Sequence, residues 1–329
     1  MTVPVLLALR KQYPDIKITM VSKTFFAPLF ASIPNVCFLE ADVDGRHKGI
    51  FGLLQLYADL KKTGVNAIAD LHNVIRSNVI TALFSLKGFP TATVDKARAE
   101  KKALTRTRNK IFTPLLPIVD RHAKVFADLG LPVTIGTHSL TTMPLAGEVL
   151  NLTGDKAHHW IGIAPFAKHE SKVYPNDLMQ KVIKALADDL NNKIFLFGAG
   201  SHEIDILNKC ASDFANSTVV AGKLKFEEEL QLISHLDVML SMDSGNAHLA
   251  ANYGIPVITL WGATHPFAGF APFGQPLENA LLADREKYPM LPTSVYGNKK
   301  IEGYQNAMQT ISPETVIHKV RSVLKKHSI

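Results

Sequence analysis

The sequence predicts an α/β protein with two doubly wound lobes, each a parallel sheet covered by helices. Short strand-like runs of apolar and β-branched residues alternate with helix-like segments along most of the chain. The length of 329 residues is typical of two domains. A turn-rich stretch, 131–154, separates two halves in which the alternation starts anew. We therefore expect one lobe over residues 1–150 and a second lobe over residues 151–329.

The first half begins with a predicted helix over residues 2–12, because Thr2 can cap it. A second helix, 49–62, carries apolar residues at helical spacing, and a third is predicted near 77–85. Short apolar or β-branched runs predict the strands 17–22, 36–39 and 67–71.

The second half alternates strands and helices strictly. Its predicted strands are 159–165, 193–198, 218–221, 238–242 and 257–261. Its predicted helices are 175–190, 203–211, 226–234, 247–253 and 313–326. The last helix is expected either to complete the second lobe or to pack back on the first.

Composition and missing motifs exclude several classes of protein. Hydrophobic residues make up 47% and charged residues 20%, which is typical of a globular chain rather than a disordered one. The two cysteines, Cys37 and Cys210, are too few for a disulfide scaffold or a Cys-rich zinc module, and they fit a reducing compartment. No apolar run approaches the about 18 residues that span a bilayer, and no signal peptide is evident. A Walker loop, an H-E-x-x-H motif and a G-x-S-x-G elbow are also absent.

The net charge of +7 is concentrated in one segment, 96–110, which carries seven basic residues and one acid. Because the charge is concentrated locally, it suggests that an anionic partner binds at this segment. Nucleic acid is not expected, because aromatic residues do not interleave with the basic ones. The plain alternative is a solvent-exposed face of a helix or loop.

The most informative motif is the junction 243–246, Asp-Ser-Gly-Asn, between an apolar strand and a helix. Its residues favour a turn that leaves the first N–H groups of the helix free at the top of a sheet. Those groups and the helix dipole suit a phosphate, and His248 can add a donor, or a charge if protonated. The alternative is a simple helix cap beside a packed histidine. The strand before and the helix after supply the context that an anion-binding motif requires.

Three more polar segments follow predicted strands. The run 198–200, Gly-Ala-Gly, resembles the start of a dinucleotide fingerprint, but Glu203 replaces the third glycine, so NAD is not predicted. The Glu203 carboxylate could instead accept hydrogen bonds from ribose hydroxyls, or simply favour the start of its helix. The loop 164–175 carries Lys172 and could reach a diphosphate. The segment 70–77 ends a buried strand of the first half with further polar groups.

Together these motifs resemble glycosyltransferase family 9, the ADP-heptose:lipopolysaccharide heptosyltransferases, which have the GT-B fold of two lobes facing a central cleft. The resemblance rests on D-[ST]-G-x-x-H-L at 243–249, followed by G-x-P at 254–256 and G-x-T at 262–264. The Lys172-Val173-Tyr174-Pro175 loop and Glu203 fall at further family positions. The similarity extends over nearly the whole chain.

The resemblance implies an inverting transferase that moves a heptose-like sugar from a nucleotide diphosphate, ADP-heptose in the family, to a lipopolysaccharide-core or related bacterial surface glycan. Lys172 would stabilise the leaving diphosphate. The residues expected to bind the donor are Asp243, Ser244, Gly245, His248, Glu203 and Thr264. The residues expected to bind the acceptor are His72, Asn73, Arg76, Lys101, Lys102, Arg106 and Arg108.

The implied acceptor is an anionic lipid-sugar at the inner membrane surface. We therefore expect a cytoplasmic chain that is peripheral on the inner face of the cytoplasmic membrane and has no transmembrane segment. No metal and no cofactor are implied, because Lys172 and the helix dipole can carry the phosphate charge.

The chain departs from the family at its amino terminus. The family opens with a strand and a Gly-Asp loop before the helix predicted here at 2–12, and that Asp is the usual candidate for the catalytic base. Neither feature is in this sequence, so we expect a first lobe without its first strand, and no base is assigned. Two alternatives therefore stay open: a non-catalytic nucleotide-sugar-binding protein and a GT-B-type nucleotide-sugar epimerase.

Overall fold

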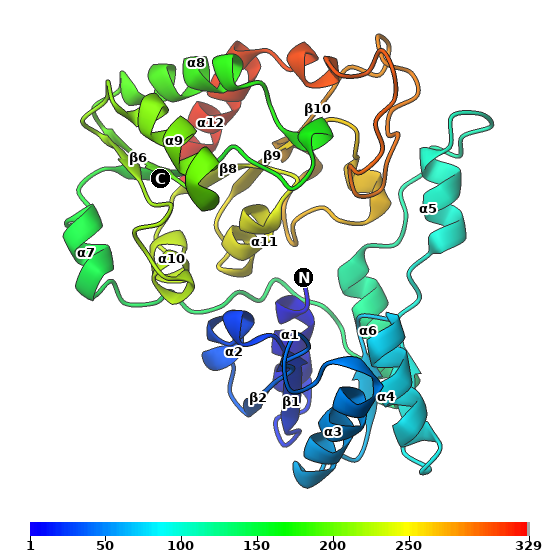
Figure 1. Ribbon diagram of the computed structural model, residues 1–329. Helices are drawn as coiled ribbons and strands as arrows, with labels where there is room; N and C mark the ends of the chain where they lie inside the picture. Colours follow the sequence, from blue (N-terminus) through cyan, green and yellow to red (C-terminus); the bar gives the residue numbers. More distant parts are fainter. Residues whose placement is uncertain (328–329) are drawn as a thin grey trace. The chain divides into compact units, whose positions relative to one another are not determined.

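The computed structural model describes residues 1–327 and divides into two compact units (Figure 1). The first unit consists of residues 1–97 and 116–140, and the second of residues 98–115 and 141 onwards. This division differs from the predicted boundary at residue 150. The basic segment 98–115, which we call the arm, groups with the second unit although it lies in the first half of the sequence.

The second unit contains one continuous parallel sheet in the order β10-β9-β8-β5-β6-β7. Its strands are β5 (His159–Ala164), β6 (Asn192–Leu196), β7 (Ser217–Val219), β8 (Val238–Met242), β9 (Val257–Trp261) and β10 (Ala280–Leu282). The first strand, β5, is central, and the chain winds outwards from it first through β6 and β7 and then through β8, β9 and β10. This is the doubly wound order, in which ligands bind at the carboxyl ends of the strands.

Helices cover both faces of this sheet. They are α7 (Gly147–Thr153), α8 (Asn176–Ala187), α9 (Gly200–Ala211), α10 (Phe226–Ile233), α11 (Gly245–Asn252) and α12 (Pro313–His327). The arm begins with α5 (Arg98–Thr105). The final helix, α12, packs on α8 and β8, so it contributes to the core of the second unit. No helix within residues 1–327 is both long enough and apolar enough to cross a bilayer.

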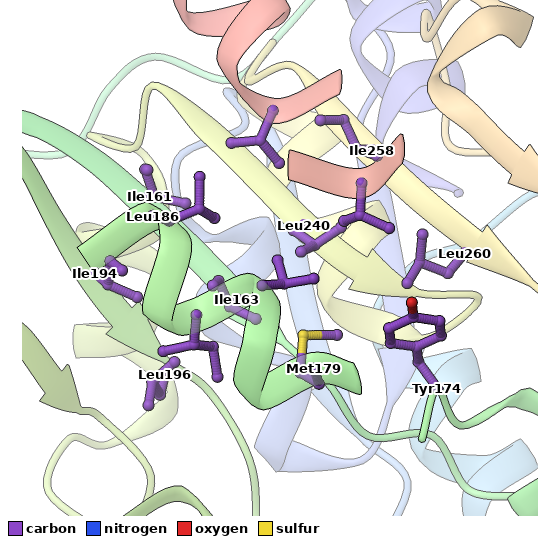
Figure 2. Packing of buried hydrophobic residues seen from close by; sticks show 14 of the residues in the cluster. Ile161, Ile163, Tyr174, Met179, Leu186, Ile194, Leu196, Leu240, Ile258 and Leu260 are labelled. Carbon is purple, nitrogen blue, oxygen red and sulfur yellow. The ribbon is translucent and has the colours of Figure 1, made fainter. Parts of the chain in front are cut away.

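The core of the second unit lies between the sheet and the helices α8 and α12 (Figure 2). Every residue of β8 and β9 is buried, as expected for parallel strands that are covered on both faces. Tyr174 is fully buried at the edge of this core, where its hydroxyl donates a hydrogen bond to the carbonyl of Ile311 at 2.6 Å. The loop after β5 is thereby anchored two residues beyond Lys172.

The first unit has a less complete sheet. Its strands β1 (Ile18–Ser22) and β2 (Val36–Glu40) form one parallel pair, and β3 (Ile68–Asp70) and β4 (Thr91–Thr93) form another. Within the described residues no strand joins the two pairs. Every position of β1 is only partly buried, whereas the central β5 of the second unit is nearly all buried. Among the described residues, the sheet of the first unit is therefore incomplete between these two pairs.

Helices and short turns complete the first unit. They are α1 (Val3–Gln12), η1 (Thr24–Phe26), α2 (Pro28–Ala31), α3 (Gly49–Lys62), α4 (Ile75–Ser85) and α6 (Ile118–Asp128). Leucines of α3 pack against Ile80 and Phe84 of α4 to form a small core. The predicted helix 49–62 is reproduced at both ends, and α4 begins two residues before the predicted position.

Candidate functional site

A pocket of about 310 Å³ lies at the carboxyl ends of β5 and β8 in the second unit. Five residues predicted from sequence line it together. They are Lys172, Asp243, Ser244, Gly245 and His248. These residues meet because the loop after β5 and the junction between β8 and α11 follow neighbouring parallel strands.

The start of α11 presents unsatisfied backbone donors. Ser244 precedes the helix in an extended conformation and makes no side-chain cap bond; its hydroxyl instead lies 3.0 Å from that of Ser241. The first N–H groups of any helix lack intrahelical acceptors. Gly245, the first helical residue, is exposed, and a Cβ added there would meet no protein atom within 4 Å. An anion can therefore approach the positive end of α11.

Lys172 and Asp243 form an ion pair inside the pocket, with 2.9 Å between Nζ and Oδ2. Both side chains are mostly buried, at 13% and 10% exposure. The Thr264 hydroxyl donates a hydrogen bond to the same Oδ2 at 2.8 Å, and Thr264 is itself buried. Thr264 therefore orients the Asp243 carboxylate from a buried position and does not itself line the pocket. A phosphate that entered the pocket would compete with Asp243 for the Lys172 ammonium.

His248 contributes a neutral ring. Its Nδ1 is buried and has no hydrogen-bond partner among the described residues. Burial, with a contribution from the charge of Lys172, lowers the pKa of His248 well below its usual value. The ring can therefore act as a hydrogen-bonding group near neutral pH, but it does not supply the positive charge that the sequence left open.

The loop around Gly297 holds the stem of Lys172. Ser171 donates a side-chain hydrogen bond to the Gly297 carbonyl at 2.6 Å and accepts one from the Ala263 amide at its own carbonyl, at 3.1 Å. Gly297 has a φ of +83°, and a Cβ on it would lie 2.5 Å from Cδ of Lys172. This close approach fixes where the lysine can point. This contact could not be predicted from sequence, because no motif connects residues 171 and 297.

Lys168, in the loop 164–175, also lines the pocket. The other three lining residues, Phe270, Val295 and Tyr296, were not predicted. Phe270 lies in the segment between β9 and β10, and Val295 and Tyr296 lie in the loop after β10, where the chain has neither helical nor strand periodicity. The rings of Phe270 and Tyr296 contact each other, with their centroids 5.8 Å apart. Only the fold brings them beside Lys172, so sequence reasoning could not have found them.

The arm packs on these same loops. Phe112 lies against the rings of His265 and Phe267, with centroids 5.0 and 4.9 Å away. The guanidinium of Arg285 lies 3.4 Å from the centroid of the Phe112 ring. The Leu115 amide donates a hydrogen bond to the Phe267 carbonyl at 2.9 Å. The arm is therefore an ordered part of the second unit.

The arm changes the predicted basic cluster. Lys101 is only 6% exposed, and its ammonium lies 4.3 Å from the centroid of the Phe270 ring. Lys102, Arg106 and Arg108 are exposed. Lys101 is therefore not part of the solvent-facing patch; its ammonium lies over the Phe270 ring instead. The acceptor role of the other three residues stays a prediction.

The remaining predicted residues lie outside this pocket. Glu203 is in the first turn of α9, where its carboxylate accepts a hydrogen bond from the Ala199 amide at 2.7 Å. His72 and Arg76 are exposed near the start of α4 in the first unit. Asn73 has a φ of +49°, and its side chain donates a hydrogen bond to the Val94 carbonyl at 2.8 Å. Contacts of these residues with ribose or acceptor stay predictions.

Comparison with known proteins identifies the class to which this fold and pocket belong. The model of glycosyltransferase family 9 (heptosyltransferase) matches residues 53–298. The chain therefore belongs to glycosyltransferase family 9 and is a glycosyltransferase.

Two curated relatives show the extent of the sequence similarity. Lipopolysaccharide heptosyltransferase 3 of Escherichia coli (strain K12) is 28% identical over 283 residues, which cover 80% of this chain and 79% of that protein. Lipopolysaccharide core heptosyltransferase OpsX of Haemophilus influenzae is 25% identical over 321 residues, which cover 96% of this chain and 90% of that protein.

Solved structures confirm the GT-B fold class. The glycosyl transferase family 9 structure from Veillonella parvula has a TM-score of 0.75 at 19% identity, over 99% of this chain and 93% of that one. The Escherichia coli heptosyltransferase WaaC, solved with ADP, has a TM-score of 0.67 at 18% identity, over 98% and 95% of the two chains. At these identities the likeness concerns the fold.

Proposed function

We propose that this chain is an inverting heptosyltransferase that takes its sugar from ADP-heptose and passes it to a lipopolysaccharide-core or related surface-glycan acceptor. The observation that carries the proposal is the pocket in which Lys172, the uncapped start of α11 and the neutral His248 converge. These groups suit a diphosphate. The two curated relatives are lipopolysaccharide heptosyltransferases, and this supports the choice of sugar and acceptor.

In the proposed reaction an acceptor hydroxyl attacks the anomeric carbon of the heptose as the bond to the β-phosphate oxygen breaks. ADP leaves with the electron pair of that bond, and its new negative charge is stabilised by Lys172 and by the N–H groups at the start of α11. As the phosphate takes over Lys172, Asp243 is released to accept a hydrogen bond from a sugar hydroxyl while Thr264 still holds it. The proton of the acceptor hydroxyl passes to a base that is not assigned among the described residues.

The proposed acceptor is an anionic lipid-sugar at the inner face of the cytoplasmic membrane. The exposed basic residues that would meet its phosphates are Arg76 in the first unit and Lys102, Arg106 and Arg108 in the arm. His72 and Asn73 would add polar contacts beside Arg76. No metal or cofactor has a role in this proposal.

The reaction is tested by measuring ADP release from ADP-heptose with and without a lipopolysaccharide-core acceptor, with UDP-sugars as the comparison. Release of ADP that depends on the acceptor supports the proposal. Turnover of the donor without acceptor would favour the epimerase alternative. Donor binding with no turnover under any condition would favour a non-catalytic binding protein, and either result would overturn the proposed transferase.

The site is tested with Lys172→Ala and His248→Ala. We expect at least a tenfold loss of ADP affinity for the lysine variant, because a buried ammonium is lost from the diphosphate, and a smaller loss for the histidine variant. Isothermal titration calorimetry with ADP gives the affinities, and thermal unfolding shows that the fold persists. Lys181→Ala, on the exposed side of α8, is the control. Unchanged affinity and rate in both site variants would defeat the assignment.

A further inference from the structure

The strand order of the second sheet arranges the site residues in a line. Neighbouring strands run in the order β6, β5, β8 and β9, and their carboxyl ends share one edge because all of them are parallel. Glu203 follows β6, Lys172 follows β5, Asp243 follows β8 and Phe270 follows β9. At about 4.8 Å per strand, β6 and β9 are roughly 14 Å apart. The phosphate-binding groups therefore lie between the carboxyl ends of β6 and β9, and the loop that leaves β9 brings Phe270 to the same pocket.

This order gives an extended donor a direction. If the diphosphate lies between Lys172 and the start of α11, one end of the donor extends towards Glu203 and the other towards Phe270. Glu203 is the residue expected to bind ribose. The group on the far side of the diphosphate, the sugar to be transferred, then meets the loops after β9.

The surface at that end of the pocket is aromatic. Phe270 and Tyr296 both line the pocket, and their rings are inclined by 49° to each other. Aromatic side chains form the apolar walls of small-molecule sites, in which a few polar groups fix the orientation of the ligand. The C–H groups on one face of a sugar ring pack on such a wall, while its hydroxyls reach polar partners such as Asp243.

The arm fixes one of the two rings. The ammonium of Lys101, a residue of α5, lies over the Phe270 ring, and Lys101 is almost completely buried. Lys110 ties the end of the arm to the same loops, because its ammonium donates hydrogen bonds to the carbonyls of Leu104, at 2.9 Å, and Pro292, at 2.7 Å. A cation held against an aromatic face in a desolvated place restrains that ring.

We infer that Phe270 and Tyr296 contact the transferred sugar of the donor, and that Lys101 is a positioning residue that holds Phe270 in place. This inference rests on the proposed function, because it assumes a nucleotide-sugar donor. It goes beyond that function by dividing the pocket into two parts. The phosphate-binding part is occupied by both ADP and ADP-heptose, whereas the aromatic part is reached only by the sugar of ADP-heptose.

The first test compares the affinities of ADP and ADP-heptose for the full chain by isothermal titration calorimetry. Phe270→Ala and Tyr296→Ala are expected to leave ADP affinity within twofold and to weaken ADP-heptose at least fivefold. Lys172→Ala is expected to weaken both ligands. Equal losses for the two ligands, or no loss for ADP-heptose, would overturn the inference. The wild-type chain is measured first, and if it bound neither ligand the proposed function itself would be overturned.

The second test concerns Lys101. Lys101→Met keeps the length of the side chain but removes its charge, and it is expected to weaken ADP-heptose about threefold without changing ADP affinity. Lys101→Arg keeps a cation over the ring and is expected to retain most of the wild-type preference. Lys287→Met is the matched control, because Lys287 lies over the ring of Tyr288 at 5.9 Å and neither residue lines the pocket.

A Lys101→Met variant that weakened both ligands equally would show a general structural role and overturn the positioning role. Kinetics gives an independent measure: the variant is expected to raise KM for ADP-heptose more than it lowers kcat. If Lys101→Met fails to fold, Lys101→Arg still decides, since loss of the ADP-heptose preference in that folded variant would contradict the inference.

Discussion

Lys172 is held by contacts on several sides before any ligand enters the pocket. Asp243 neutralises its ammonium, Gly297 packs on its stem, and Tyr174 anchors the loop two residues further on. Such restraint lowers the entropy that a diphosphate would have to remove from the side chain when it binds. The ion pair with Asp243 opposes binding, so the affinity for phosphate reflects the exchange of one anionic partner for another.

Gly297→Ala tests the contact with the lysine stem. The new Cβ would lie 2.5 Å from Cδ of Lys172, so we expect the lysine to shift and ADP affinity to fall about tenfold. Gly303→Ala is the matched control, because Gly303 also has a positive φ, +78°, but a Cβ there meets no atom within 4 Å. Both variants carry the same backbone strain, so calorimetry with ADP separates strain from contact. Equal affinities in the two variants would contradict the role of Gly297.

Asp243→Asn tests the exchange of partners. The amide keeps the size of the side chain but no longer competes with phosphate for Lys172 or repels it, so we expect ADP to bind roughly fivefold more tightly. Sugar transfer is expected to slow, because the variant lacks the carboxylate that would accept a hydrogen bond from a sugar hydroxyl. Glu170→Gln, which alters an exposed ion pair with Lys300 and lies in the loop that carries Lys172, is the control. Weaker ADP binding by the Asn variant would show that Asp243 does not oppose phosphate.

At the scale of helices and strands, the sequence predicted the second unit well. The strands β5, β8 and β9 are continuous apolar runs bounded by turns, and their positions agree with the prediction within one residue at either end. The helix α7 was missed because it lies inside the turn-rich stretch 131–154. The strand β10 was missed because its three residues are too few for a pattern.

In the candidate site, too, the residues on elements with a clear sequence pattern could be predicted and the residues in irregular loops could not. The phosphate-binding part lies directly on elements with clear periodicity, so a motif at 243–248 could indicate it. The aromatic part depends on Phe270 and Tyr296, whose loops after β9 are positioned by long-range contacts with the arm. The burial of Lys101 was hidden for the same reason, since a charged run in sequence does not show which of its members has an apolar partner.

One helix allows a test by pH. Burial raises the pKa of Glu229 in α10 from 4.5 to about 7. Below pH 4.5 the carboxyl group is protonated in both the folded and the unfolded state and costs nothing. Between pH 4.5 and about 7 the carboxyl group ionises in the unfolded state but stays protonated in the folded state, so stability is lost over this range and the loss is complete above pH 7. Glu229→Gln should therefore raise the free energy of unfolding by about 2 kcal/mol at pH 8 and leave it unchanged at pH 4.

Denaturant unfolding at the two pH values provides this measurement. Glu227→Gln, an exposed residue in the same turn, is the control and should show no difference between them. A gain for Glu229→Gln that was equal at pH 4 and pH 8 would rule out the ionisation of Glu229 as its cause.

At the scale of the whole molecule, the two units differ in how completely their sheets are built. The second has six paired strands, whereas the first has two separate pairs among the described residues. Hydrogen exchange should therefore be faster in β1 and β2 than in β5 and β8, because fewer of the backbone groups in those pairs are protected on both sides. Mass spectrometry of peptides covering 18–22, 36–40, 159–164 and 238–242 measures this. Equal protection in the two units would contradict it.

The path of the chain determines how the protein can be dissected. The polypeptide leaves the first unit after residue 97, returns at 116 and leaves again after 140, so neither unit is one uninterrupted stretch. A fragment cut at residue 141 would lose the arm and expose Phe267 and Phe270 to water. Its counterpart, ending at 140, would carry Phe112 with nothing to cover it. To express the two units separately, residue 97 would have to be joined to residue 116 in the first unit. The arm, 98–115, would have to be linked to the segment that begins at residue 141 in the second.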